Sequence, residues 1–221
     1  NEGHISQAFG YEAADGSRRV IRISATQNDF IADKYAFEHF GSTLPVPRIL
    51  EIGQFGQDAH YCISERATGV NSNKLPSDEF VRALPAINDT FAAVFNTNIS
   101  STKGYGHIDF KTGNGPHASW RETLLAQLDN MPLEQLRQNA TNIGVDPELI
   151  QPFIDQYTSN LEYAPEERQL SHGDLGFDNI LIENNRVTAI IDWASVGYAE
   201  WMYDYTIFEA PDPAYWVAHG Y

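Results

Sequence analysis

Two short segments near the start of the chain alternate between apolar and polar residues, which is the pattern of strands that bury one face. They are residues 19–24 and 59–65. Between them, residues 29–40 repeat apolar side chains at helical spacing, with Asn28 or Asp29 as the expected N-cap and Gly41 at the end. The prolines within residues 43–50 then favour extended chain, because proline disfavours the helical conformation of the residue before it. The first part of the chain is therefore predicted to consist of strands and one helix.

From about residue 71 the pattern becomes helical. Apolar side chains recur at intervals of three and four at Phe80, Leu84, Ile87, Phe91 and Val94, and Pro85 either kinks this helix or marks a restart. Residues 119–131 and 147–161 are further predicted helices, and residues 104–117 read as a loop. The pattern predicts an α+β chain with a small strand-rich lobe at residues 1–66 and a larger helical lobe at 67–221, crossing at 66–70.

Composition narrows the function classes. The chain has 221 residues and a formal net charge of −16, which argues against binding nucleic acid or anionic membranes and permits a polycationic substrate. The alternative is that acidity simply keeps a cytosolic protein soluble. No apolar run is long enough for a membrane helix, no secretory signal is visible, and the single Cys62 has no disulfide partner in the chain. We therefore expect a cytoplasmic protein, and a monomer.

The candidate chemistry lies between residues 170 and 201. Residues 180–182 and 187–191 are apolar runs joined through Asn184 and Asn185, which suit a tight hairpin turn because asparagine tolerates positive φ. A hairpin would bring Asn179, before its first strand, close to Asp192, after its second. His172 and Asp174 enter the same end through the preceding loop.

These polar residues suggest a catalytic centre that uses a divalent cation. An amide oxygen beside a carboxylate suits a hard cation such as Mg²⁺. Asp174 is then a candidate base and His172 an orienting group. The spacing H-x-D-x-x-x-x-N, followed by an aspartate after a hairpin, matches the kinase catalytic loop and its metal-binding aspartate. Alternatively, each residue caps a turn on its own, but four of them at this spacing favour a site.

Two departures from protein kinases point to a more specific resemblance. Gly173 stands in place of the kinase arginine, and Asp192-Trp193 in place of D-F-G. With these features, "HGDLGFDNILI" and "VTAIIDW" resemble the aminoglycoside phosphotransferase family, as do "LPVPRILEIG", "YCISERATGV", "GNGPHASWRETLL" and "YAEWMYDYTIF". Within the family, the similarity is greatest to the hygromycin B phosphotransferases. The resemblance implies a protein-kinase-like bilobal fold whose C-terminal lobe would be incomplete here.

The resemblance also implies roles for the residues of the stretch. Asp174 would be the base that accepts the proton of a substrate hydroxyl, and His172 would brace its loop. Asn179 and Asp192 would hold Mg²⁺ on the phosphates of the nucleotide. Asp204 matches a family acid that supports the loop, and we leave it outside the catalytic set.

The small lobe of the family needs a strand cation paired with a helix carboxylate. Arg22 stands where a lysine is usual, although it could also be a surface residue of its strand. Asp33 lies on the apolar face of the predicted helix, where an unpaired charge is costly, whereas Glu38 lies opposite and four residues after Lys34. We therefore assign Asp33 as the partner of Arg22.

The remaining nucleotide contacts follow from position within the family. Residues 2–13 lie where the family has its phosphate-covering loop, so Ser6 is a candidate phosphate contact. Glu65 to Ala67 would form the hinge whose backbone binds the base, with ATP or GTP as co-substrate.

The leading hypothesis is transfer of the nucleotide γ-phosphoryl group to a hydroxyl of a small cationic molecule. An aminoglycoside such as hygromycin B is favoured, which would give antibiotic resistance. A kinase of a macrolide, choline or homoserine is the alternative, and a Mg²⁺-dependent phosphohydrolase or a non-catalytic nucleotide-binding relative comes after it.

Overall fold

The computed structural model describes residues 7–130 and 132–207, and its contacts divide the chain into two compact units. Among these residues, the first unit holds 7–99, 170–196 and 201–207, and the second holds 100–130, 132–169 and 197–200. These units are defined by contacts within the chain and do not test the lobe boundary expected near residue 66, which stays a prediction. No helix among the described residues is long and apolar enough to cross a membrane.

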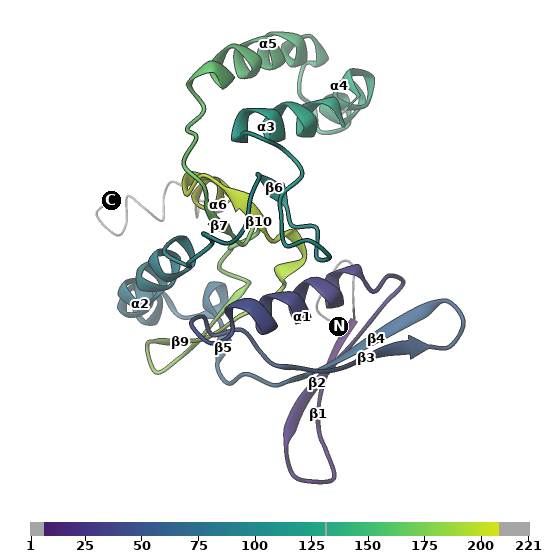
Figure 1. Cartoon of the computed structure of the whole chain (residues 1–221), viewed down its shortest axis with the longest axis vertical. Coiled ribbons are helices and arrows are strands. Elements are labelled where there is room, and N and C mark those ends of the chain that lie inside the picture. Colours follow the sequence, from purple (N-terminus) through teal and green to yellow (C-terminus); the bar gives the residue numbers. More distant parts are fainter. Residues whose placement is uncertain (1–6, 131, 208–221) are drawn as a thin grey trace. The chain divides into compact units, whose positions relative to one another are not determined.

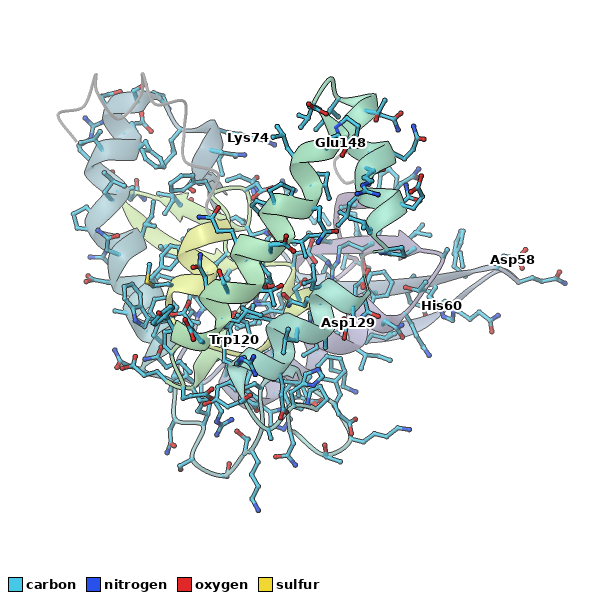
Figure 2. The ribbon with its side chains drawn as sticks, turned by 90° about the horizontal axis from the view of Figure 1, so that it is seen from above. Asp58, His60, Lys74, Trp120, Asp129 and Glu148 are labelled. Atoms are coloured by element: carbon cyan, nitrogen blue, oxygen red, sulfur yellow. The ribbon has the colours of Figure 1, made fainter. Side chains whose placement is uncertain are left out.

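The first unit is built around a four-stranded antiparallel sheet in the order β1-β2-β4-β3. Its strands are β1 (Gln7–Glu12), β2 (Arg18–Ser24), β3 (Ile49–Phe55) and β4 (Ala59–Glu65). Helix α1 (Asn28–Phe40) runs beside the sheet (Figure 1) and buries Phe30, Ala36 and Phe40. Figure 2 shows Asp58 at the outer end of the hairpin that joins β3 and β4.

The two predicted strands and the predicted helix of this region are confirmed, with one difference at the helix start. The N-cap position is Gln27, one residue before the expected pair, and its side chain makes no capping hydrogen bond. Helix α1 ends where predicted, because the Gly41 N–H donates to the Phe37 carbonyl.

A second sheet of this unit carries the stretch with the candidate chemistry. It has the order β5-β8-β9, from β5 (Val70–Asn71), β8 (Ile180–Glu183) and β9 (Arg186–Ile190). Asn184 and Asn185 have φ values of 53° and 59°, so the predicted tight hairpin is confirmed, with both turn residues left-handed. Ile180 and Ile190 face each other across the hairpin and are fully buried.

Helix α2 (Ser77–Phe95) packs against β9 and runs through Pro85 as one helix, so the alternative of a restart at this proline is wrong. Its buried side chains include Phe80, Ile87, Phe91 and Val94, the stripe that the spacing predicts. The unit is completed by the 3-10 turns η1 (Ser72–Lys74) and η4 (Trp193–Ser195) and by helix α6 (Met202–Ile207).

The second unit contains three short helices, α3 (Trp120–Asp129), α4 (Leu133–Asn142) and α5 (Ile150–Asn160). Trp120 and Asp129 mark the two ends of α3 in Figure 2. The strands β6 (Gly106–His107) and β10 (Gly197–Ala199) pair within this unit, β7 (Gln169–Ser171) begins at its boundary, and the 3-10 turns η2 (Pro147–Leu149) and η3 (Leu161–Tyr163) flank α5. Helices α3 and α5 were predicted, whereas α4 was not.

Candidate active site

A cavity of about 300 Å³ lies within the first unit, over the sheet that holds β1 and β2. Five of the residues expected to bind nucleotide or metal line it: Arg22, Asp33, Glu65, Ala67 and Asp192. The sheet, helix α1, the end of β4 and the residues after β9 each contribute to the wall. Ser6, the remaining expected nucleotide contact, lies outside the described residues. Sequence segments more than a hundred residues apart thus meet in one concave site of the kind that holds small molecules.

Arg22 and Asp33 form an ion pair in the wall of this cavity. Their side chains are 18% and 7% exposed, and the guanidinium lies 5.1 Å from the ring centre of Phe30. Burial, the largest single influence, would lower the pKa of Arg22, but the charge and hydrogen bond of Asp33, together with the charges of Cys62 and Asp192, outweigh it and the net shift is upward. Glu38, the competing acid, instead pairs with Lys34 at 3.8 Å on the exposed side of α1. The structure thus contains the pairing we assigned, and its role in nucleotide binding stays a prediction.

The second carboxylate oxygen of Asp33 holds the chain next to Asp192. Its Oδ1 accepts a hydrogen bond of 2.9 Å from the Trp193 N–H, while Oδ2 pairs with Arg22. Asp192 itself has a left-handed backbone with φ of 64°, a conformation that aspartate and asparagine adopt more readily than most residues. One buried carboxylate therefore fixes both the cation on β2 and the turn that presents Asp192.

The hairpin brings Asn179 and Asp192 to its open end, as predicted. The Ile191 N–H donates to the Asn179 carbonyl at 2.9 Å, so Asn179 lies opposite Ile191, the residue directly before Asp192. Burial raises the pKa of Asp192, the nearby charge of Asp33 adds to the rise, and Arg22 opposes it. A cation beside Asp192 would relieve this unfavourable environment.

Asn179 is oriented by the loop that carries Asp174. Its Nδ2 donates to the Asp174 carbonyl at 2.7 Å and to Asp174 Oδ2 at 3.2 Å. The amide nitrogen is thus engaged by Asp174, which leaves the amide oxygen to act as a ligand. Asp174 itself is exposed, which agrees with its predicted role as the base.

The donor set fits Mg²⁺. One carboxylate and one amide oxygen are hard ligands, and a magnesium site often takes only one or two protein groups and completes its shell with phosphate oxygens and water. The described residues contain no cluster of three or more His, Cys, Asp or Glu side chains that could hold a metal by themselves.

We expect Asp192→Asn to weaken binding of nucleotide in the presence of Mg²⁺ by at least about tenfold, since even loss of a residue that only supports a metal ligand costs that much. Asparagine tolerates the same left-handed backbone, so the fold should be kept. Titration with and without EDTA measures the effect. An equal loss of affinity in EDTA would contradict the metal role.

His172 links the loop that carries Asp174 to the segment before Asp192. Its buried ring donates from Nε2 to the Ile191 carbonyl at 3.0 Å and accepts at Nδ1 from the Asp174 N–H at 3.3 Å. A carbonyl can only accept and an amide N–H can only donate, so these partners select the neutral Nε2–H tautomer. Burial lowers the pKa of His172 to about 4, in agreement with a neutral ring. His172 is therefore placed to position Asp174 and is itself shielded from solvent.

This buried histidine predicts a specific loss of stability in acid. The unfolded chain takes up a proton as the pH falls through about 6.5, whereas the folded chain does so only near its pKa of about 4. Protonation therefore favours the unfolded state across that window. Relative to His172→Gln, which has no such proton, the wild type should lose roughly 2–3 kcal/mol of unfolding free energy between pH 7 and about pH 4.5. Denaturant titrations of both proteins at the two pH values check this, and a constant difference would contradict it.

Asp204, which we left outside the catalytic set, holds the start of the same loop. It is fully buried and accepts hydrogen bonds from Ser171 Oγ at 3.0 Å and from the backbone N–H groups of His172 at 2.9 Å and Gly173 at 2.7 Å. Burial raises the pKa of Asp204 and the three donors oppose the rise. Gly173 has φ of 79°, and a Cβ there would overlap the Ser195 carbonyl. Any side chain at Gly173, such as the kinase arginine, is thus excluded at this point.

Residues 71–73, directly after the crossing segment, make contacts that the sequence did not reveal. Asn71 Nδ2 donates to the Asp178 carbonyl, and Ser72 Oγ donates to the Phe177 carbonyl at 2.7 Å. The Asn73 N–H also donates to Phe177 at 3.2 Å. These bonds fix the end of the catalytic loop directly before Asn179. The partners are more than a hundred residues apart, and no local pattern marks them.

Comparison with known proteins shows to which family the chain belongs. The model of the APH phosphotransferase enzyme family matches residues 19–208, which is most of the chain. The chain belongs to this family. It is 33% identical over 205 residues to the hygromycin-B 4-O-kinase of Escherichia coli, a match that covers 92% of the chain and 59% of that relative. The chain thus spans less than two thirds of the length of this relative.

Solved structures of APH enzymes agree with the fold. A thermostable APH(4)-Ia variant in ternary complex with AMP-PNP and hygromycin B superposes with a TM-score of 0.81 at 31% identity, over 92% of this chain and 68% of that one. APH(4)-Ia itself gives 0.77 at 29% identity, over the same shares of the two chains. A macrolide 2'-phosphotransferase shares only the fold, with a TM-score of 0.60 at 13% identity over 94% and 70%. The predicted α+β kinase-like fold and the similarity to hygromycin B phosphotransferases are confirmed.

Proposed function

We propose that this protein is an O-phosphotransferase that moves the γ-phosphoryl group of ATP or GTP to a hydroxyl of an aminoglycoside, with hygromycin B as the favoured substrate. The observation that carries the proposal is the joining of Asp174, Asn179 and Asp192 at the open end of one hairpin. The Arg22–Asp33 pair then links Asp192 to the wall of a cavity of suitable size.

The residues would divide the work as follows. Glu65 to Ala67 would hold the base of the nucleotide, and Arg22, kept in place by Asp33, would meet its phosphates. Asn179 and Asp192 would bind Mg²⁺, which when bound neutralises charge on the transferring phosphoryl group. Residues 1–66 would form the nucleotide-binding lobe and residues 67–221 the catalytic lobe.

Asp174 would orient the substrate hydroxyl and accept its proton as the oxygen attacks phosphorus. His172 would act through the backbone of Asp174 and hold this loop in a fixed position relative to Asp192. Much of the rate of phosphoryl transfer comes from positioning and charge stabilisation, and proton removal adds to them. The hydrogen bonds around Asp174 are the feature of this chain that supplies such positioning.

The substrate class is supported by charge and by similarity. The net charge of −16 favours a cationic partner over nucleic acid or anionic membranes. The relative with 33% identity is a hygromycin-B kinase, and APH(4)-Ia has been solved with that antibiotic bound. We further propose that the protein is a cytoplasmic monomer that confers resistance to the antibiotic.

A nucleotide-consumption assay over a panel of acceptors tests the proposal. The panel contains hygromycin B, other aminoglycosides, a macrolide, choline and homoserine, each with ATP and with GTP. We expect consumption that depends on hygromycin B or another aminoglycoside. Consumption that depends only on a macrolide, choline or homoserine would replace the substrate class, and consumption without any acceptor would indicate a phosphohydrolase.

A further inference from the structure

Two guanidinium groups line the cavity, and only one of them is neutralised. The charge of Arg22 is matched by Asp33, with which it forms a buried ion pair. Arg66 also lines the cavity, and within residues 7–130 and 132–207 its side chain makes no ion pair or hydrogen bond. Its donors are therefore available to a ligand.

The fold holds Arg66 at the hinge end of the cavity. Arg66 directly follows β4, and its backbone N–H donates to the Arg18 carbonyl at 3.1 Å. Its side chain turns toward β1, where Nη1 lies 2.7 Å from the point that a Cβ of Gly10 would occupy. The close approach depends on the absence of a side chain at Gly10, so the guanidinium lies against the β1 backbone.

The register of the sheet separates this guanidinium from the phosphate end. Ala8 lies opposite Arg22, and Gly10 lies opposite Val20. Gly10 is thus two residues from Ala8 along β1, or about 7 Å at the usual rise of a strand, and the displacement runs toward the hinge. Arg22 and Asp192 mark the end of the cavity expected to receive the phosphates, so Arg66 lies beside the part that would receive the nucleoside.

We propose that Arg66 binds the nucleoside part of the nucleotide, an inference that rests on the proposed function. A guanidinium is planar and carries only donors, so it can stack on a purine face and donate to ring or ribose acceptors. Its side chain reaches from the hinge to β1 along the wall of the cavity, beside the place of the nucleoside. Arg66 is thus a binding residue for the base and ribose and makes no contact with the phosphates.

The experiment compares a nucleoside with its diphosphate. Wild-type protein is titrated with ADP and GDP in EDTA, and then with the nucleoside of whichever binds. We expect Arg66→Ala to lower the affinity for the nucleoside and the affinity for the diphosphate by the same factor, on the order of 3- to 30-fold. Gly10→Ala keeps the charge of Arg66 but displaces its guanidinium, so it should also lower the affinity for both ligands.

Arg18→Ala is the matched control, because it removes the same charge from an exposed residue that does not line the cavity. Its affinities should stay within about twofold of wild type, as expected for a screened surface charge. If Arg66→Ala weakens the diphosphate alone, or neither ligand, the inference is overturned while nucleotide binding stands. If wild-type protein binds no nucleotide either in EDTA or with Mg²⁺, the proposed function and this inference both fail.

Discussion

Replacing Asp174 by asparagine is expected to lower kcat by about 10²- to 10⁴-fold while leaving nucleotide affinity unchanged. Asparagine has the same shape and can still accept the hydrogen bond from Asn179, which lies 3.2 Å from Asp174 Oδ2. It cannot accept the proton of a substrate hydroxyl. Steady-state kinetics with the aminoglycoside and a separate nucleotide titration measure the two effects.

Asp178→Asn is the matched control for this variant, because it makes the same chemical change in the same loop. Asp178 is exposed, and it accepts the hydrogen bond from Asn71 through its backbone carbonyl, which the substitution keeps. Its kcat should remain near that of wild type. Full activity in Asp174→Asn would remove Asp174 from the role of base.

The second large effect is expected at Asp33. Asp33→Ala should lower the free energy of unfolding by about 3–5 kcal/mol, because it leaves the buried guanidinium of Arg22 without its partner. The same change removes the acceptor of the Trp193 N–H, so the turn that presents Asp192 should loosen. We therefore also expect a higher KM for the nucleotide. Denaturant unfolding and kinetics with varied nucleotide check the two effects.

Glu38→Ala is the control for Asp33, since both acids lie on α1 and Glu38 pairs with Lys34 at the surface. Its cost should be about 0.5 kcal/mol or less. Adding Arg22→Leu to Asp33→Ala should recover part of the stability, because the unpaired buried charge is then gone. Equal costs for Asp33→Ala and Glu38→Ala would contradict the assignment of Asp33.

The parts of the site that the sequence reveals are those with local patterns. The position of Asp33 on the apolar stripe of a helix is enough to assign it as the buried partner of Arg22, and the structure contains that pair. Asn184 and Asn185 likewise predict the hairpin turn, which in turn brings Asn179 and Asp192 together.

The parts that could not be predicted depend on contacts between distant segments. Asn71 and Ser72 hold the end of the catalytic loop through bonds to carbonyls 107 and 105 residues away. Any polar side chain at those positions would look like an ordinary loop residue. The role proposed for Arg66 could not be predicted either, because it depends on the approach of its side chain to Gly10 on another strand. Tertiary hydrogen bonds to backbone atoms leave no periodic signal in the sequence.

The central claim is that the phosphoryl group is transferred to the antibiotic. Mass spectrometry of hygromycin B after incubation with nucleotide and protein tests this most directly, with Asp174→Asn run in parallel. The account predicts a singly phosphorylated antibiotic in amounts equal to the nucleoside diphosphate formed, and strongly reduced product with the variant. Unmodified antibiotic alongside nucleoside diphosphate and inorganic phosphate would contradict it.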